Sequence, residues 1–165
     1  MKPLLLSYAA YNLWANQQIM VRLKTLPTSV LYTKVRSSFE SLYATVLHLL
    51  DAENMWSQRI HLAEKVVRPS DLFTGDFESL SEKLLHQSEA WYNWVSKMQD
   101  RMIAHEIIYY NTKKEPFKQP VSDILLHLFN HSTFHRGQLI NIMRQLDLDA
   151  LPNTDYINWC RKYNV

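Results

Sequence analysis

The segment HLFNHSTFHRGQL, residues 127–139, places three histidines at intervals of four: His127, His131 and His135. Residues four apart lie on one face of an α-helix, with their Cβ atoms about 5–6 Å apart. Neutral imidazoles on such a face are able to bind one divalent ion, each through a ring nitrogen. The spacing therefore indicates metal chemistry, and the helical phase decides which of the three histidines takes part.

An apolar stripe along this helix fixes the phase. Its members are Ile124, Leu128, His131, His135, Leu139, Ile142 and Leu146. At about 100° per residue they fall within roughly 80° of arc, which marks the face toward the core. By the same arithmetic His135 is central, His131 lies about 40° from the centre and His127 about 80° from it. The core-facing pair is therefore predicted to be His131 and His135, with His127 at the edge.

A stable site needs a third protein ligand, which in a helix bundle comes from a facing helix. The segment TVLHLLDAENMW supplies His48, which is surrounded by apolar residues. A lone histidine on an apolar face is more often a hydrogen-bonded core residue, and that alternative stays open for each of the three. Three buried imidazoles all need polar partners, however, and one shared ion would satisfy them together. We interpret His48, His131 and His135 as candidate ligands.

Other metal motifs fit less well. Ser132 stands where a zinc-protease helix carries its catalytic glutamate, so His-Glu-x-x-His is absent. The paired Glu-x-x-His motifs of a di-iron bundle are also missing. A haem held between two histidines would leave the third unexplained.

Composition restricts the class of protein. A chain of 165 residues with 47% hydrophobic content is predicted to form a single domain, residues 1–165, with a real core. Its two glycines, Gly75 and Gly137, argue against a sheet-rich fold and against glycine-rich phosphate or dinucleotide loops. A net charge of +2 without a basic run predicts no binding to nucleic acid.

The cellular setting is inferred from two further observations. The single cysteine, Cys160, has no partner for an intramolecular disulfide, which favours a reducing, cytoplasmic location. The first residues are interrupted by polar side chains too early for a secretory signal, and no segment reaches the roughly 18 apolar residues of a membrane span. We therefore expect no association with a membrane.

The helical period predicts four long helices. The first three are expected at about Leu4–Leu23, Phe39–Ile60 and Phe77–Met98. The fourth is expected to begin after Pro120, with Ser122 or Asp123 as its cap, and to end at about Leu146. Between the third and fourth, β-favouring residues 107–110 and a turn-like segment 111–114 predict a connector with a small hairpin. A short final helix is expected from Asp155 to Lys162. The predicted fold is an all-α four-helix bundle.

A second apolar set on the fourth helix suggests self-association. It consists of Leu125, Phe129, Ile140 and Met143, on the side away from the histidine stripe. If a bundle used one face of each helix, these residues, with Leu13 and Met20 of the first helix, would be exposed in a monomer. We therefore expect a homodimer through the first and fourth helices, unless the final short helix, with Tyr156, Ile157 and Trp159, covers this surface.

Four segments together resemble the DinB family, also called the DinB/YfiT-like family of metalloenzymes. They are YNLWANQQI (11–19), HLLDAE (48–53), HLFNHSTFHRGQL (127–139) and LPNTDYINW (151–159). The resemblance covers nearly the whole chain in the family's order. It implies a left-handed up-down-down-up bundle, commonly dimeric, in which one histidine of the second helix and two of the fourth bind a divalent ion, usually nickel or zinc. On this chain those residues are His48, His131 and His135.

The resemblance also has departures. Many relatives carry a second histidine before the last one of the motif, where this chain has Phe134, and many turn the hairpin with glycine, where this chain has NTKKE. Related branches include transferases and isomerases that use low-molecular-weight thiols.

A site with three protein ligands leaves a coordination position open, which permits hydrolysis or thiol transfer. The first functional hypothesis is therefore a metal-dependent hydrolase or thiol S-transferase acting on a small molecule. The alternative is a non-catalytic, stress-associated metal-binding or interaction protein with a structural ion. Asp51 and Asn130 are either partners of the ligands or ordinary surface residues, and the second reading is preferred. Gly137 is expected to permit a close helix approach.

Overall fold

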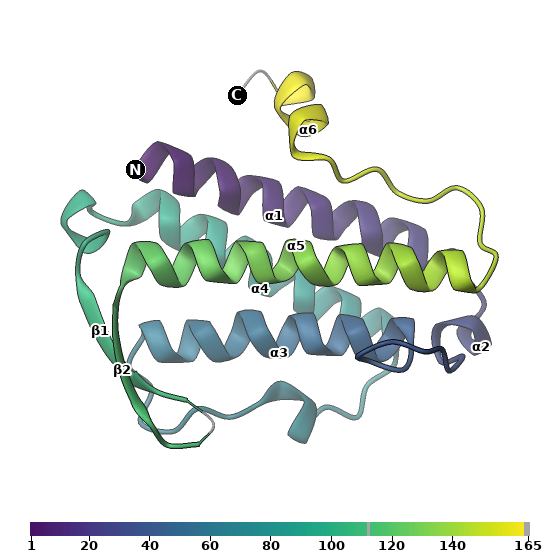
Figure 1. Cartoon of the computed structure of the whole chain (residues 1–165), viewed down its shortest axis with the longest axis horizontal. Helices are drawn as coiled ribbons and strands as arrows, with labels where there is room; N and C mark the ends of the chain where they lie inside the picture. Colours follow the sequence, from purple (N-terminus) through teal and green to yellow (C-terminus); the bar gives the residue numbers. More distant parts are fainter. Residues whose placement is uncertain (112, 164–165) are drawn as a thin grey trace.

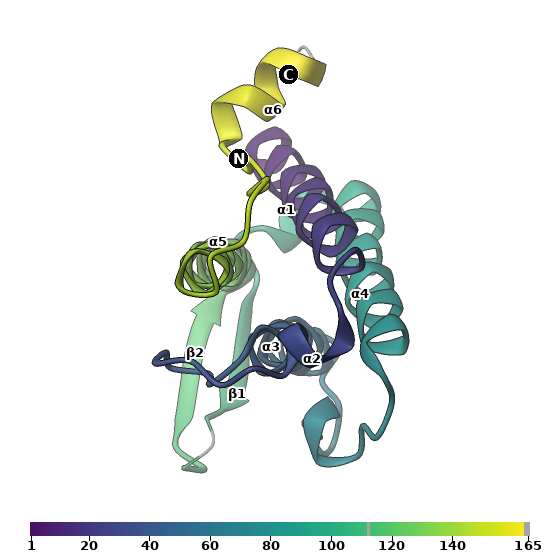
Figure 2. The same cartoon turned by 90° about the vertical axis from the view of Figure 1, so that its right-hand side faces the viewer.

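The computed structural model describes residues 1–111 and 113–163. The described residues form four long helices: α1 (Lys2–Leu23), α3 (Leu42–Ile60), α4 (Phe77–Lys97) and α5 (Val121–Gln145). Figure 1 shows them side by side, with α1 and α5 running in one direction and α3 and α4 in the other. Viewed from the end of the bundle in Figure 2, each helix lies between two neighbours, and α3 and α1 both pack against α5. The predicted all-α bundle is confirmed.

Short elements complete the chain. They are α2 (Thr28–Leu31), the 3₁₀ turns η1 (Pro69–Asp71) and η2 (Asp100–Met102), β1 (Glu106–Tyr110), β2 (Pro116–Pro120) and α6 (Tyr156–Tyr163). The two strands pair antiparallel, with Glu106 opposite Pro120 and Tyr110 opposite Pro116. The small hairpin expected in the connector is therefore present. None of the described helices is long and apolar enough to cross a membrane.

The start of α3 differs from the prediction. The helix begins at Leu42, because Oγ of Ser41 accepts a hydrogen bond from the Ala44 amide at 3.1 Å and so caps the first turn. The predicted start near Phe39 lay three residues too early. Phe39 instead precedes the helix and stacks on His48, with ring centroids 4.0 Å apart. The capping residue thus leaves Phe39 free to cover the candidate ligand.

The first turn of α5 is not capped by the residues predicted for it. Neither Ser122 nor Asp123 is its cap, because Val121 already has helical geometry. The amides of Val121 and Ser122 donate instead to the carbonyls of His105 and Ile103, at 2.9 and 3.0 Å. Backbone groups of the preceding connector therefore satisfy the orphan donors of this helix end.

The expectation that a second face of α5 is exposed in a monomer is wrong. Leu125 and Met143 have no exposed surface within the single chain, and Phe129 and Met20 are 1% exposed. In a ring of four helices each one packs against two neighbours, so α5 buries one side against α3 and another against α1. This burial removes the argument given for a dimer. The homodimer itself stays a prediction, which light scattering at micromolar concentration tests.

The final helix packs against the first helix, one of the two helices that form the expected surface. Figure 2 shows α6 beside α1, and Trp159 joins Tyr11 and Ala15 in a small apolar cluster there. The Tyr11 hydroxyl also donates to the carbonyl of Thr154 at 2.6 Å. The C-terminal segment is therefore attached to the outside of α1, away from the faces that position the histidines.

Candidate metal centre

Three histidines converge between α3 and α5. His48 lies in α3, and His131 and His135 lie one turn apart in α5. Their Nε2 atoms form a small triangle, with 3.3 Å from His48 to His131 and 3.1 Å for each of the other two pairs. The structure thus brings together the three residues selected from the sequence. His127 lies one turn earlier, its ring centroid 5.8 Å from that of His131, and is not part of the triangle.

Hydrogen bonds within the triangle cannot satisfy all three nitrogens. Each Nε2 of a neutral imidazole presents either a proton or a lone pair. Among three such atoms at least two are alike, so any choice of tautomers leaves two protons or two lone pairs facing each other at 3.1–3.3 Å. A cation at the centre removes this conflict, because all three atoms then present lone pairs to it.

The dimensions of the triangle suit such an ion. For metal–nitrogen distances of about 2.0–2.1 Å, nitrogens separated by 3.1–3.3 Å subtend angles of about 95–110°. These angles lie between the octahedral and tetrahedral values. The three histidines therefore fit one face of either coordination geometry.

Gln138 fixes the orientation of one ligand. Nδ1 of His135 donates to Oε1 of Gln138 at 2.8 Å, which leaves the lone pair on Nε2 directed at the centre. The Gln138 amide nitrogen donates in turn to Ser38 Oγ at 3.3 Å. This contact was not predicted from the sequence. The position of Gln138 three residues after His135, and so on the same helix face, was the signal for this role.

Burial keeps the three imidazoles neutral. Desolvation, with the nearby His135 and Arg68, lowers the pKa of His48 to about 4. Desolvation and the three neighbouring histidines lower the pKa of His131 to about 4 as well. The pKa of His135 is lowered by burial, an effect that its bond to Gln138 opposes. At neutral pH the three rings are therefore in the form that binds metal.

Residues near the ligands in sequence have other roles. Asp51 accepts hydrogen bonds from the amide and hydroxyl of Ser70, at 2.8 and 2.7 Å, and so attaches η1 to α3. Asn130 is exposed. The preferred reading as an ordinary surface residue therefore fits Asn130 but is wrong for Asp51, which is buried and contacts Ser70 instead of a ligand. The expectation for Gly137 is wrong, because a Cβ atom added there would meet nothing within 4 Å.

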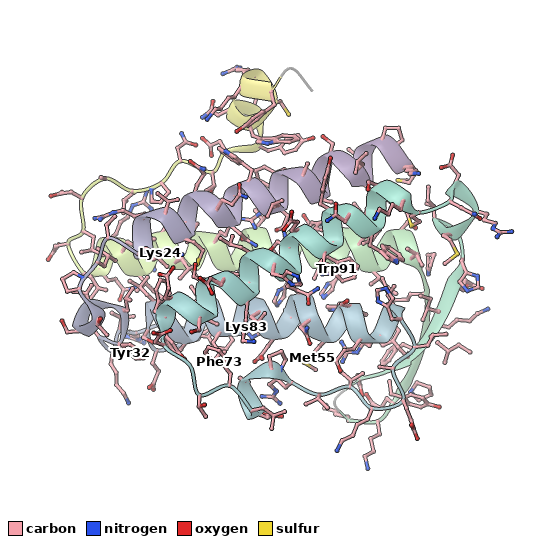
Figure 3. The ribbon with its side chains drawn as sticks, turned by 180° about the vertical axis from the view of Figure 1, so that it is seen from behind. Lys24, Tyr32, Met55, Phe73, Lys83 and Trp91 are labelled. Carbon is pink, nitrogen blue, oxygen red and sulfur yellow. The ribbon has the colours of Figure 1, made fainter. Side chains whose placement is uncertain are left out.

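A buried polar layer lies beside the centre. Glu53 of α3 is fully buried, and its Oε1 accepts from the amide nitrogens of Asn12 and Asn16 in α1, at 2.8 and 3.0 Å. Its other oxygen accepts from Ser88 of α4 at 2.8 Å. Trp91 of α4, labelled in Figure 3, donates to the backbone carbonyl of Glu53. Burial raises the pKa of Glu53, while its hydrogen bonds and Arg136 oppose that rise.

Arg136 completes this layer from α5. Its Nη1 donates to the side-chain oxygens of Asn12 and Asn16, at 2.6 and 3.0 Å. Each of these asparagines therefore links the buried guanidinium to the buried carboxylate of Glu53. The network gives Arg136 a structural role, because it fixes the rotation of α5, and with it the direction of His135. The two asparagines were not predicted from the sequence, although their spacing of four residues in an apolar helix was a signal for a shared role.

Comparison with known proteins agrees with this architecture. The family model described as the DinB family matches residues 1–159. The chain belongs to the DinB family. Protein DinB of Bacillus subtilis (strain 168) is 29% identical over 155 residues, which cover 88% of this chain and 87% of the relative. The crystal structure of a DinB-like protein from Bacillus cereus ATCC 10987 superposes with a TM-score of 0.64 at 18% identity, over 84% of this chain and 89% of that one.

Proposed function

We propose that this DinB-family protein is a metal-dependent enzyme that transfers a low-molecular-weight thiol to a small electrophile, with zinc or nickel bound by His48, His131 and His135. The observation that carries the proposal is the converging triangle of Nε2 atoms. Among the residues that the structure describes, no carboxylate, thiol or further imidazole joins these three. Three protein ligands leave at least one coordination position for a substrate, as in catalytic rather than structural sites.

Thiol chemistry fits the surroundings better than hydrolysis. A divalent ion also makes bound water nucleophilic, but metal-dependent hydrolases commonly add a general base near the reacting atoms. The two nearby carboxylates of α3 are already engaged, Asp51 by Ser70 and Glu53 by the asparagines of α1. A divalent ion in the site would lower the pKa of a coordinated thiol, and so supply a thiolate without a protein base. The sulfur then forms a bond to an electrophilic carbon, the leaving group departs with its bonding electrons, and the thiol proton passes to solvent.

Aromatic side chains beside the ligands favour an apolar electrophile. Phe134 is 63% exposed, and its ring centroid is 5.1 Å from that of His135. Phe39 is half-buried and stacks on His48 from the other helix. Phe134 is also the position at which this chain lacks the additional histidine of many relatives. The chemistry proposed here therefore uses the three ligands and no fourth imidazole.

The experiment begins with untagged protein, purified and analysed for bound metal, then stripped and reloaded with zinc or nickel. Cysteine and glutathione are offered as thiols and monochlorobimane as the electrophile, and the fluorescent product is followed. The loaded protein is expected to accelerate the reaction over the buffer rate, and His131→Ala is expected to abolish the acceleration. His127→Ala is the matched control, because it removes an imidazole from the same helix outside the triangle.

Equal rates for the loaded, stripped and His131→Ala proteins would contradict the proposal. Stoichiometric metal without any acceleration would favour the non-catalytic alternative, a structural ion. Hydrolysis of a small ester at a metal-dependent rate, without thiol transfer, would replace the proposed reaction and keep the site.

A further inference from the structure

A sizeable cavity lies away from the three histidines. It has a volume of about 560 Å³ and is enclosed by the last turns of α3, the loop that follows and the β1–β2 hairpin. Figure 1 shows the hairpin beside that end of α3, and Figure 3 labels Met55, which lines the cavity. A space of this size accommodates a small organic molecule. Its walls combine apolar and cationic side chains, among them Met55, Arg59, Val66, Tyr109 and Lys114.

Arg59 is the central cation of this cavity. Its guanidinium carbon lies 4.6 Å from the ring centroid of Trp56 and 5.6 Å from that of Tyr109. Its Nε is buried and has no hydrogen-bond partner among the described residues. Among the described residues, no carboxylate oxygen lies within 4.0 Å of the side-chain nitrogens of Arg59. The cation is therefore held in place by aromatic rings, and none of the described carboxylates pairs with it.

The rest of the lining is compatible with a negatively charged ligand. Two exposed lysines, Lys65 and Lys114, and one exposed glutamate, Glu64, line the cavity together with Arg59. Positive charge therefore exceeds negative charge around the opening. Burial also lowers the pKa of Arg59, which shows that desolvation works against its charge. An incoming anion would relieve this penalty.

We propose that this cavity is a binding site for a small organic acid, whose carboxylate pairs with Arg59 and whose apolar body lies against Met55 and Tyr109. Arginine suits this role, because its planar fork donates two parallel hydrogen bonds to a carboxylate. A guanidinium that packs against two aromatic rings is restricted in rotation, and its outer nitrogens remain available to a ligand. The ligand class follows from the walls: an acid group for the cation and a flat, apolar body for the aromatic and aliphatic side chains.

The site is separate from the metal centre and goes beyond the proposed function. Trp56 contacts Arg59 on one side and His127 on the other, where the ring centroids are 5.3 Å apart. His127 in turn lies beside His131. Two side chains therefore stand between the cavity and the nearest ligand, and binding of the organic acid is independent of the metal.

Isothermal titration calorimetry on the full chain tests the proposal with two matched probes, 1-naphthoate and its neutral analogue 1-naphthalenemethanol. The carboxylate is expected to bind at least tenfold more tightly than the alcohol, since a charge-assisted pair with arginine is worth about that factor. Removing the metal with a chelator is expected to leave the affinity for naphthoate within about twofold. Loss of binding on chelation would show that the acid binds the metal, and would overturn the proposal.

Variants assign the binding to Arg59. Arg59→Gln is expected to weaken naphthoate binding at least about tenfold and to leave the alcohol unchanged, whereas Arg59→Lys keeps the charge and is expected to fall between. Arg101→Gln is the matched control, because this exposed arginine does not line the cavity. Met55→Trp, which fills the cavity without a change of charge, is expected to block both probes. Thermal melting establishes that each variant is folded.

The proposal is overturned if naphthoate does not bind up to about 1 mM, a concentration at which even weak specific sites are occupied. It is also overturned if the acid and the alcohol bind equally, or if Arg59→Gln binds as well as Arg101→Gln. A tight complex that is insensitive to Met55→Trp would place the acid elsewhere on the molecule.

Discussion

Glu53 and Arg136 are two buried charges that do not touch, and their coupling through Asn12 and Asn16 makes a quantitative prediction. Replacing Glu53 by glutamine keeps the shape of the side chain but exchanges one of its two acceptor oxygens for an NH2 donor and removes the negative charge that acts on Arg136. Removing one member of a buried charged network typically costs about 3–5 kcal/mol, because the other charge stays buried without compensation. We expect that loss in the free energy of unfolding.

The measurement is urea and thermal unfolding of metal-free protein, so that differences in metal content do not contribute. For a chain of this size the expected loss corresponds to a decrease in Tm of roughly 6–20 °C. Glu82→Gln, an exposed position on α4, is the matched control and is expected to change stability by less than about 0.5 kcal/mol.

A double-mutant cycle with Arg136→Met then measures the coupling. Once the guanidinium is absent, the carboxylate of Glu53 has lost its positive partner, so the second substitution is expected to cost less than it does alone. Residues within one network commonly show coupling energies of about 0.5–3 kcal/mol. Additive effects of the two substitutions, or a Glu53→Gln variant as stable as Glu82→Gln, would refute the interpretation of the asparagines as a link between the charges.

Three further predictions concern the histidines. Alanine at His48, His131 or His135 is expected to abolish stoichiometric metal in elemental analysis while His127→Ala retains most of it; the reverse pattern for His127 and His131 would contradict the observed triangle. Chelation is expected to lower the Tm but to leave a helical far-ultraviolet spectrum. The ion adds about 2.7 kcal/mol to the free energy of unfolding when its concentration is a hundredfold above its Kd, and chelation removes that contribution. A coil spectrum after chelation would mean that the ion organises the core. Metal-free protein is expected to lose stability as the pH falls from about 6.5 toward 4. In that range histidines of the unfolded chain bind protons, whereas His48 and His131 of the folded chain, each with a pKa of about 4, do not. If the Tm of His48→Ala depended on pH as steeply as that of the parent chain, the lowered pKa of His48 would not be the cause.

The sequence by itself determined the helices and the direction of the histidines along them. The phase of α5 needed only the 3.6-residue period, so His131 and His135 could be placed toward the core and His127 at its edge. His48 was selected because it interrupts an apolar run in a segment that forms a helix. These properties depend on residues within a few turns of one another, which is why the sequence was sufficient for them.

Only the tertiary structure decided which helices are neighbours and how each is rotated against two others at once. That arrangement buries Leu125 and Phe129 within one chain and joins Glu53 to Arg136 through α1. It also brings Tyr109 of the hairpin to Arg59 of α3, about fifty residues earlier in the chain. A helical period specifies that a face is apolar or polar, but the partner of that face is set by packing between distant segments, and these contacts exist only once the bundle has formed.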